Sequence, residues 1–158
     1  SSRSIPVRIA SRYCHEVNYS MHGKRYFSVG LQNQKGGWEL RNKYLKNSSS
    51  PKSYSFIGGK SDQILITEGM FDFLSLNLLE SGLVKTSDCL VLNSVSFVRD
   101  IKSILPRYKR ILLYLDNDPA GRNAADYLLS TYDTARDRSG RYTSFLDPNE
   151  WLQYGHRQ

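Results

Sequence analysis

Three acidic residues stand at the ends of apolar runs, at positions where carboxylates could do chemistry. Glu68 follows "QILIT", Asp116 follows "RILLYL", and Asp118 comes two residues later. Alternate residues of a strand project to the same side, so Asp116 and Asp118 can present both carboxylates to one point. Two ionised carboxylates that lie close together repel unless a proton, a basic side chain or a metal ion neutralises them. No Lys or Arg lies between Asn117 and Gly121. The sequence therefore favours a divalent cation such as Mg²⁺, which binds a few carboxylate oxygens with water and phosphate.

Simpler roles are open to some of these acids. Asp118 precedes Pro119, and Asp at the N-cap with Pro at the first helical position is an ordinary helix start. Asp116 and Glu68 have no such explanation, because an unpartnered carboxylate at the end of a buried strand costs free energy. Asp72 follows Glu68 by four residues, and it either points back toward Glu68 or complements a helix N-terminus.

The elements that must position these acids are strands and helices in alternation. The runs "QILITEG", "DCLVLNSVS" and "KRILLYLDND" lack alternation, as strands covered on both faces do. Helices are expected at "MFDFLSLNLLESG", "SFVRDIKSILP" and "PAGRNAADYLLS", with Gly82 and Pro106 as stops. This order predicts an α/β fold with a mostly parallel sheet and helices on both faces. The three acids then share the carboxyl edge of the strands, which is the working surface of such a sheet.

The front of the chain has a different pattern. "KRYFSVGLQN" alternates as a half-buried strand does, and "QKGGWELRNKYL" adds a Gly-Gly turn and another strand. The serine-rich stretch "KNSSSPKS", residues 46–53, is expected to be a connector. We therefore predict a basic, β-rich segment over residues 1–60 and an α/β domain over residues 61–158.

Charge is divided in the same way. Residues 1–60 hold eleven Lys and Arg against two acids, a balance of +9, whereas residues 61–158 hold eleven against thirteen, a balance of −2. A basic part beside a part rich in carboxylates suits a polyanionic ligand handled by metal-bound acids, although a solvated basic surface is the plain alternative. No apolar stretch is long enough for a membrane span, and we expect an intracellular protein with Cys14 and Cys89 as reduced thiols.

Two longer motifs carry a family resemblance. "ITEGMFDFLSL" and "LLYLDNDPAGRNAA" resemble the two signatures of the Toprim domain, the catalytic module of type IA and type II topoisomerases, bacterial primases and several nucleases. The family pattern of an acid with Gly, followed later by Asp-x-Asp, falls on Glu68, Gly69, Asp116 and Asp118. The resemblance covers about residues 62–153 and implies a Toprim/Rossmann-like sheet.

The primase branch of this family supplies further matches. Its Asp four residues after the Glu and its Gly three after the second Asp correspond to Asp72 and Gly121, and "FLDPNEWL" resembles its acidic segment at Asp147. The chain departs from the family at Asn93–Ser96, "LNSVS", where a Gly-Thr often follows the middle strand.

The resemblance implies catalytic residues and a cofactor. Glu68, Asp116 and Asp118 would hold one or two Mg²⁺ (or Mn²⁺) ions for nucleotidyl or phosphoryl transfer, with Glu68 alternatively a general acid/base. Asp72 and Asp147 would be secondary metal ligands. The chain would be a catalytic domain of a primase-like nucleotidyltransferase, cut from a longer protein and able to bind metal even if inactive alone.

The leading segment resembles the part that precedes Toprim in primase-like proteins of mobile elements. It implies a bacterial, cytoplasmic replication or mobilisation protein that works on DNA, single-stranded or primer–template, with nucleotides and other domains of a longer polypeptide as partners and no membrane. The expected phosphate contacts are Lys24, Arg25, Arg41, Lys43 and Lys46. Tyr26, Trp38 or Tyr44 would stack on bases, unless they belong to the core. A Toprim nuclease, or a nucleic-acid-binding module with a vestigial metal site, remains as an alternative.

Overall fold

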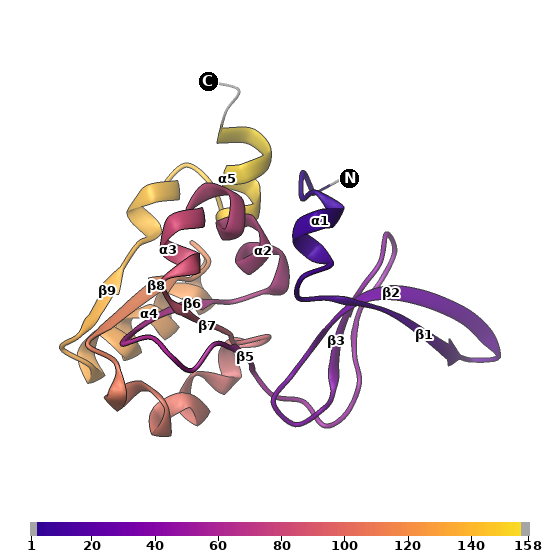
Figure 1. The fold of residues 1–158 in the computed structure, drawn as a ribbon, viewed down its shortest axis with the longest axis horizontal. Helices are drawn as coiled ribbons and strands as arrows, with labels where there is room; N and C mark the ends of the chain where they lie inside the picture. Colours follow the sequence, from indigo (N-terminus) through magenta and orange to yellow (C-terminus); the bar gives the residue numbers. More distant parts are fainter. Residues whose placement is uncertain (1–2, 156–158) are drawn as a thin grey trace.

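The computed structural model describes residues 3–155, which form two β-sheets and a set of short helices (Figure 1). The first part of the chain contains α1 (Val7–Ala10), β1 (His15–Met21), β2 (Lys24–Gln32), β3 (Trp38–Arg41) and β4 (Lys46–Ser48). The second part contains β5 (Ser55–Ile57), β6 (Gln63–Thr67), α2 (Met70–Leu79), α3 (Ser81–Lys85), β7 (Asp88–Val91), η1 (Val95–Ser103), η2 (Leu105–Arg107), β8 (Arg110–Tyr114), α4 (Pro119–Thr131), β9 (Ala135–Asp137), η3 (Ser139–Tyr142) and α5 (Pro148–Tyr154).

The first sheet is an antiparallel meander in the order β1-β2-β3-β4, and its long β1–β2 hairpin projects away from the rest of the molecule (Figure 1). The hairpin turn places His22 and Gly23 at φ 51° and 74°, the left-handed conformation of the tight turns that join twisted strands. Ser28 and Gly30 are buried whereas Phe27 and Val29 are exposed, so the predicted alternation in β2 holds up to Gly30 with the small residues on the covered side. It ends at Leu31, which is buried next to Gly30. The connector expected over residues 46–53 is shorter than predicted, because its first three residues form β4 and pair with β3.

The second sheet has the order β5-β7-β6-β8-β9. The three strands expected from the apolar runs form its parallel centre, with β9 parallel to β8 and β5 antiparallel to β7 at the edge. The outer strands are three residues long, too short for a hydrophobic period to reveal them. The predicted α/β class with a mostly parallel sheet is confirmed.

Apolar side chains cover both faces of this sheet, because successive strand residues point to opposite sides. Leu65 belongs to a cluster that includes Phe73 of α2 and Ile9 of α1, and the partly buried Trp151 of α5 packs against this cluster. Its neighbour Ile64 packs on the other face, in a cluster formed by α4, η1 and η2. Residues 3–155 contain no helix with the length and apolar character to cross a bilayer.

Two expected helix features are wrong. "SFVRDIKSILP" forms the 3₁₀ helices η1 and η2 and no α-helix. At the start of this segment, the Ser94 hydroxyl accepts a hydrogen bond from the Ser96 N–H, a local contact that competes with α-helical hydrogen bonds. Near its end, Pro106 has no N–H to donate to an α-helical hydrogen bond. Gly82 lies inside α3 and ends nothing; α2 instead stops at Leu79, before Glu80 with φ −131°.

Candidate functional site

The carboxyl edge of the second sheet brings the predicted acids into one neighbourhood. Glu68 directly follows β6, and Asp116 follows β8, the strand that pairs with β6 in parallel. The pKa of Asp116 is raised from 3.8 to about 7, chiefly by burial and then by the nearby charges of Glu68, Asp147 and Asp118. These mutual effects show that the four carboxylates lie within electrostatic reach of one another, and we call this group of acids the acid pocket.

Glu68 and Asp116 have the least-satisfied carboxylates of this pocket. Glu68 Oε2 and Asp116 Oδ1 are buried and have no hydrogen-bond partner within residues 3–155. The pKa of Glu68 is also raised, chiefly by burial and then by Asp118, although Lys46 and the backbone N–H of Asp116 oppose the rise. Buried carboxylate oxygens without partners are costly, so both residues are poised to gain a proton or a cation.

Asp118 and Asp72 support the pocket from helix N-termini. Asp118 is the N-cap of α4, and its Oδ1 accepts a hydrogen bond from the Gly121 N–H at 2.8 Å. The helix-capping role expected for Asp118 is therefore confirmed. Asp72 Oδ2 accepts from the Gly69 N–H at 3.0 Å. Burial, followed by the charges of Asp147 and Asp116, holds the pKa of Asp72 well above its usual range. Asp72 therefore both caps α2 and belongs to the acid group.

Asp147 enters the pocket through a segment that Asn117 holds in place. Asp147 caps α5 by accepting from the Glu150 N–H at 2.7 Å. The Asn117 N–H donates to Leu146 O at 2.7 Å, and its side-chain amide donates to Tyr142 O at 3.1 Å and Phe145 O at 2.9 Å. The middle residue of Asp-x-Asp thus points away from the two acids but binds the loop that delivers a further one.

Asn117→Ala is expected to loosen residues 142–147 while the fold persists. Two side-chain hydrogen bonds to carbonyls are lost, at about 1–3 kcal/mol of the free energy of unfolding. Amide hydrogen exchange should accelerate in that segment, whereas the β6–β8 amides should keep their protection. Unchanged exchange at Phe145 and Leu146 would refute the positioning role of Asn117.

Gly121 and Asn93 explain two local sequence features. A Cβ at Gly121 would collide with the carbonyl oxygen of Asp116, so the Gly of the motif lets α4 begin against the strand end. Asn93 stands where the family often has Gly-Thr, and its φ is 64°, a left-handed value that Gly favours and Asn tolerates. Its N–H donates to Glu68 O at 2.9 Å, and its side chain donates to Ser53 O and Ser55 Oγ.

The pocket fits a divalent cation of a particular kind. Across residues 3–155, no three His, Cys, Asp or Glu side chains are grouped as a ready-made metal cage. Mg²⁺ usually needs no such cage, because it keeps several waters and is held by one or two carboxylates together with substrate phosphates. The unpaired oxygens of Glu68 and Asp116 provide that donor set.

The basic residues predicted to contact phosphate differ in their exposure and in their partners within the protein. Lys46, at the start of β4, lies close enough to lower the pKa of both Glu68 and Asp116. Lys24, Arg25 and Lys43 are exposed. The Arg41 side chain is only 12% exposed, donates to Leu40 O and Asn47 O, and pairs with Glu39, so Arg41 has little surface left for a phosphate.

The aromatic residues predicted to stack on bases also differ in exposure and in their contacts within the protein. Tyr44 is 82% exposed and Lys43 lies over its ring. Tyr26 stacks on Tyr19 at 5.6 Å between ring centroids. Trp38 is half-buried and packs edge-to-face on His15, so it serves mainly the sheet.

A cavity of about 510 Å³ lies between the first sheet and the loop that follows β7. It is lined by Glu39, Lys46, Asn47, Ser48, Lys52, Asn93, Ser94, Ser96 and Phe97. Lys46 lines this cavity and lowers the pKa of both Glu68 and Asp116, and the Asn93 N–H donates to Glu68 O, so the cavity lies near the acids. The sequence pointed to Lys46 but not to Lys52, Glu39 or Phe97, which no motif marks.

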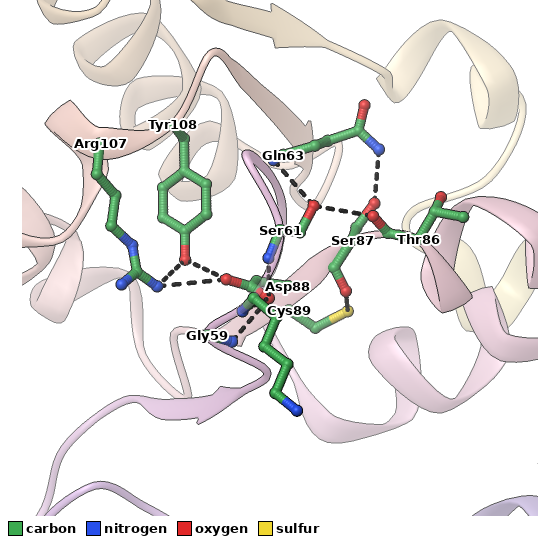
Figure 2. Close-up of polar contacts among 10 residues, drawn as sticks. Gly59, Ser61, Gln63, Thr86, Ser87, Asp88, Cys89, Arg107 and Tyr108 are labelled. Atoms are coloured by element: carbon green, nitrogen blue, oxygen red, sulfur yellow. Dashed lines mark hydrogen bonds and ion pairs between the residues drawn. The ribbon is translucent and has the colours of Figure 1, made fainter.

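A second cavity, of about 830 Å³, lies at the opposite edge of the sheet, near the start of β7. Its hydroxyls are committed within the protein: Ser61 Oγ donates to Thr86 O at 2.8 Å and Ser87 Oγ to Leu83 O at 2.7 Å. Figure 2 shows Tyr108 and Arg107 directed at Asp88 there. We interpret this cluster as structural, because Asp88 and the serine hydroxyls are already bound by partners within the protein.

Comparison with known families agrees with the geometry. The profile described as Toprim-like matches residues 65–152, which contain every predicted acid. The profile of a domain of unknown function matches residues 1–50. A search of curated protein sequences returned no match.

Several solved structures share the fold. The primase fragment of the bacteriophage T7 primase-helicase protein has a TM-score of 0.71 and 22% identity, over 99% of this chain and 68% of that chain. A chain from the structure of T7 lagging-strand DNA polymerase with primase domains bound to an RNA/DNA hybrid and dTTP has a TM-score of 0.67 and 20% identity, over 98% and 84%. The zinc-binding and RNA polymerase domains of Aquifex aeolicus primase give 0.58 and 15%, over 96% of this chain and 50% of that chain. At these identities the likeness is one of fold.

Proposed function

Because the chain belongs to the Toprim-like family, we propose that it is the Toprim module of a primase-like replication or mobilisation protein. Its reaction is nucleotidyl or phosphoryl transfer on nucleic acid, dependent on Mg²⁺ or Mn²⁺. We further propose a bacterial, mobile-element origin, in line with the primase-like segment at the front of the chain. The observation that carries the proposal is the pair of buried, unpartnered oxygens on Glu68 and Asp116 beside a basic sheet.

The acids of the pocket would have different roles, because their hydrogen-bond partners differ. Glu68 and Asp116 would hold the cation, with Asp118 beside them, while Asp72 and Asp147 would be secondary ligands held at the starts of α2 and α5. A bound divalent cation supplies positive charge that positions phosphates and stabilises charge developing on their oxygens. With its raised pKa, Glu68 is also suited to hold or release a proton at its carboxylate.

The basic residues would deliver the substrate. Lys24, Arg25, Lys43 and Lys46 are exposed on the first sheet, and their charges would neutralise a nucleic-acid backbone led toward the acids. The exposed ring of Tyr44 is available for an unpaired base.

The activity is tested by incubating the protein with single-stranded DNA, nucleoside triphosphates and Mn²⁺ or Mg²⁺. Metal-dependent oligonucleotide synthesis is the expected result. Metal-dependent cleavage of single-stranded or nicked DNA would favour the nuclease alternative. DNA binding that is equally strong in EDTA, with neither reaction, would favour a binding module with a vestigial site.

Lys46→Ala is expected to weaken binding of single-stranded DNA about three- to tenfold at low salt, because one phosphate contact beside the acids is lost. The slope of log affinity against log salt concentration should fall by about 1. Fluorescence anisotropy of a labelled oligonucleotide measures both quantities. Lys109→Ala is the matched control, since Lys109 is 81% exposed, pairs with Asp62 at 3.1 Å and lies at the far edge of the sheet. Equal losses in the two variants would count against a specific role of Lys46.

A further inference from the structure

A buried carboxylate with spare acceptor capacity lines the cavity of the first sheet. Glu39 on β3 is only 6% exposed. Its partner within residues 3–155 is Arg41, whose Nη1 lies 3.6 Å from Glu39 Oε2, longer than a charge-assisted hydrogen bond. A carboxylate accepts about four hydrogen bonds and donates none when ionised, so Glu39 retains acceptors that the protein leaves unused.

The surroundings of Glu39 match the other parts of a nucleotide. Lys46 and Lys52 line the same cavity and lie near enough to act on the charge of Glu39. Their ammonium groups suit phosphate oxygens. Phe97 lines the same cavity, and an aromatic side chain offers apolar surface and stacking to any base.

A carboxylate discriminates among bases because it needs donors opposite both of its oxygens. On the pairing edge, guanine presents two adjacent donors, N1–H and the N2 amino group. Adenine and cytosine each place a ring acceptor beside their amino group, and uracil or thymine flanks one N–H with two carbonyls. Paired acceptors and donors on a base edge are what sequence readout in proteins uses.

We propose that Glu39 reads guanine in this cavity, with its carboxylate accepting from N1–H and N2–H while Lys46 and Lys52 hold the phosphate. The inference rests on the proposed function in that the ligand is a nucleotide. It adds a base preference and places the determinant in the leading segment, outside the residues that match the Toprim-like family.

The test is titration of the intact chain in EDTA with the 5′-monophosphates of guanosine, inosine, adenosine, cytidine and uridine, followed by calorimetry or NMR. Guanosine monophosphate should bind about tenfold more tightly than the adenosine, cytidine and uridine forms. Inosine monophosphate, which keeps N1–H but lacks the N2 amino group, should fall between. Equal affinities for the five nucleotides, or a preference for a base other than guanine, would overturn the assignment.

Glu39→Gln supplies the second arm. Gln has nearly the same shape but only one acceptor oxygen, so the guanine preference should disappear while affinity for adenosine monophosphate stays within about twofold. Glu16→Gln is the control, because Glu16 is an exposed acid on β1 of the same sheet. A guanine preference that survives in Glu39→Gln would show that another group reads the base.

This test and that of the proposed function can fail separately. Base preference is measured without metal, whereas Mn²⁺ affinity at Glu68 and Asp116 is measured without nucleotide. Loss of one result leaves the other standing.

Discussion

Asp116→Asn is expected to abolish measurable Mn²⁺ binding, with a loss of affinity of more than about 100-fold. Replacing residues that merely orient a metal ligand already costs about 10- to 100-fold, and Asp116 is itself the proposed ligand with an unpaired buried oxygen. The amide keeps the shape of the side chain but removes its charge, so the pocket loses a formal negative charge and an anionic donor. Titration of Mn²⁺ followed by electron paramagnetic resonance measures the free ion directly.

The control for this result is Asp126→Asn. Asp126 is an exposed carboxylate on α4, within the same domain, and its replacement changes the net charge equally. Mn²⁺ affinity should stay within about twofold of the unmodified chain, since exposed charges are screened by salt. Retained Mn²⁺ affinity in Asp116→Asn would remove the basis of the proposed reaction.

The same variant has a second, opposite effect on stability. The pKa of Asp116 is raised from 3.8 to about 7 in the fold. Between these values the folded state keeps a proton that the unfolded chain has released. The free energy of unfolding in EDTA should therefore fall as the pH rises from about 4 to about 7 and then level off. Asp116→Asn should reduce this slope, although the raised pKa values of Glu68, Asp72 and Asp147 keep part of it. It should also raise the melting temperature at pH 8 by about 2–4 °C, for a gain of about 1 kcal/mol. Thermal unfolding across this pH range checks the sign.

The centre of the fold was predictable because its signals are local. Each of β6, β7 and β8 contains consecutive apolar residues and is followed within two positions by a polar or acidic residue, and the alternation in β2 is also visible in the sequence. The strands β4, β5 and β9 are three residues long, and they exist because a neighbouring strand supplies hydrogen bonds. No period in the sequence encodes such edge strands.

In the candidate site, too, some residues could be predicted from the sequence and others could not. Glu68, Asp116 and Asp118 stand out in sequence because carboxylates are unusual at the ends of buried strands. Asn117 and Glu39 do not stand out, since Asn is ordinary in a turn and Glu is ordinary in a half-exposed strand. Their roles depend on partners 25 or more residues away for Asn117 and on a cavity between two sheets for Glu39. Such roles appear only once the chain is folded.

Asp88→Ala is expected to be the most destabilising single substitution at the edge opposite the acids. Asp88 is 2% exposed, and its Oδ1 accepts from the N–H groups of Gly59, Lys60 and Ser61 at 2.7, 3.2 and 3.2 Å. Its Oδ2 accepts from Tyr108 Oη at 2.6 Å (Figure 2). Burial raises the pKa of this carboxyl, but these hydrogen bonds outweigh burial and hold the pKa below its usual value.

Removing the carboxylate would leave three backbone donors and a buried hydroxyl without their acceptor. We expect a loss of about 3–5 kcal/mol in the free energy of unfolding, because stranding buried partners of a charged group costs about that much. This corresponds to a fall in melting temperature of about 6–20 °C. Asp62→Ala is the matched control, since the Asp62 side chain is 63% exposed and pairs with exposed Lys109; its replacement should cost less than about 1 kcal/mol. If Asp88→Ala unfolded at the temperature of Asp62→Ala, the hydrogen bonds around Asp88 would contribute little to stability.

Mn²⁺ affinity should be unchanged in folded Asp88→Ala, because this cluster and the acid pocket lie at opposite edges of the same strands.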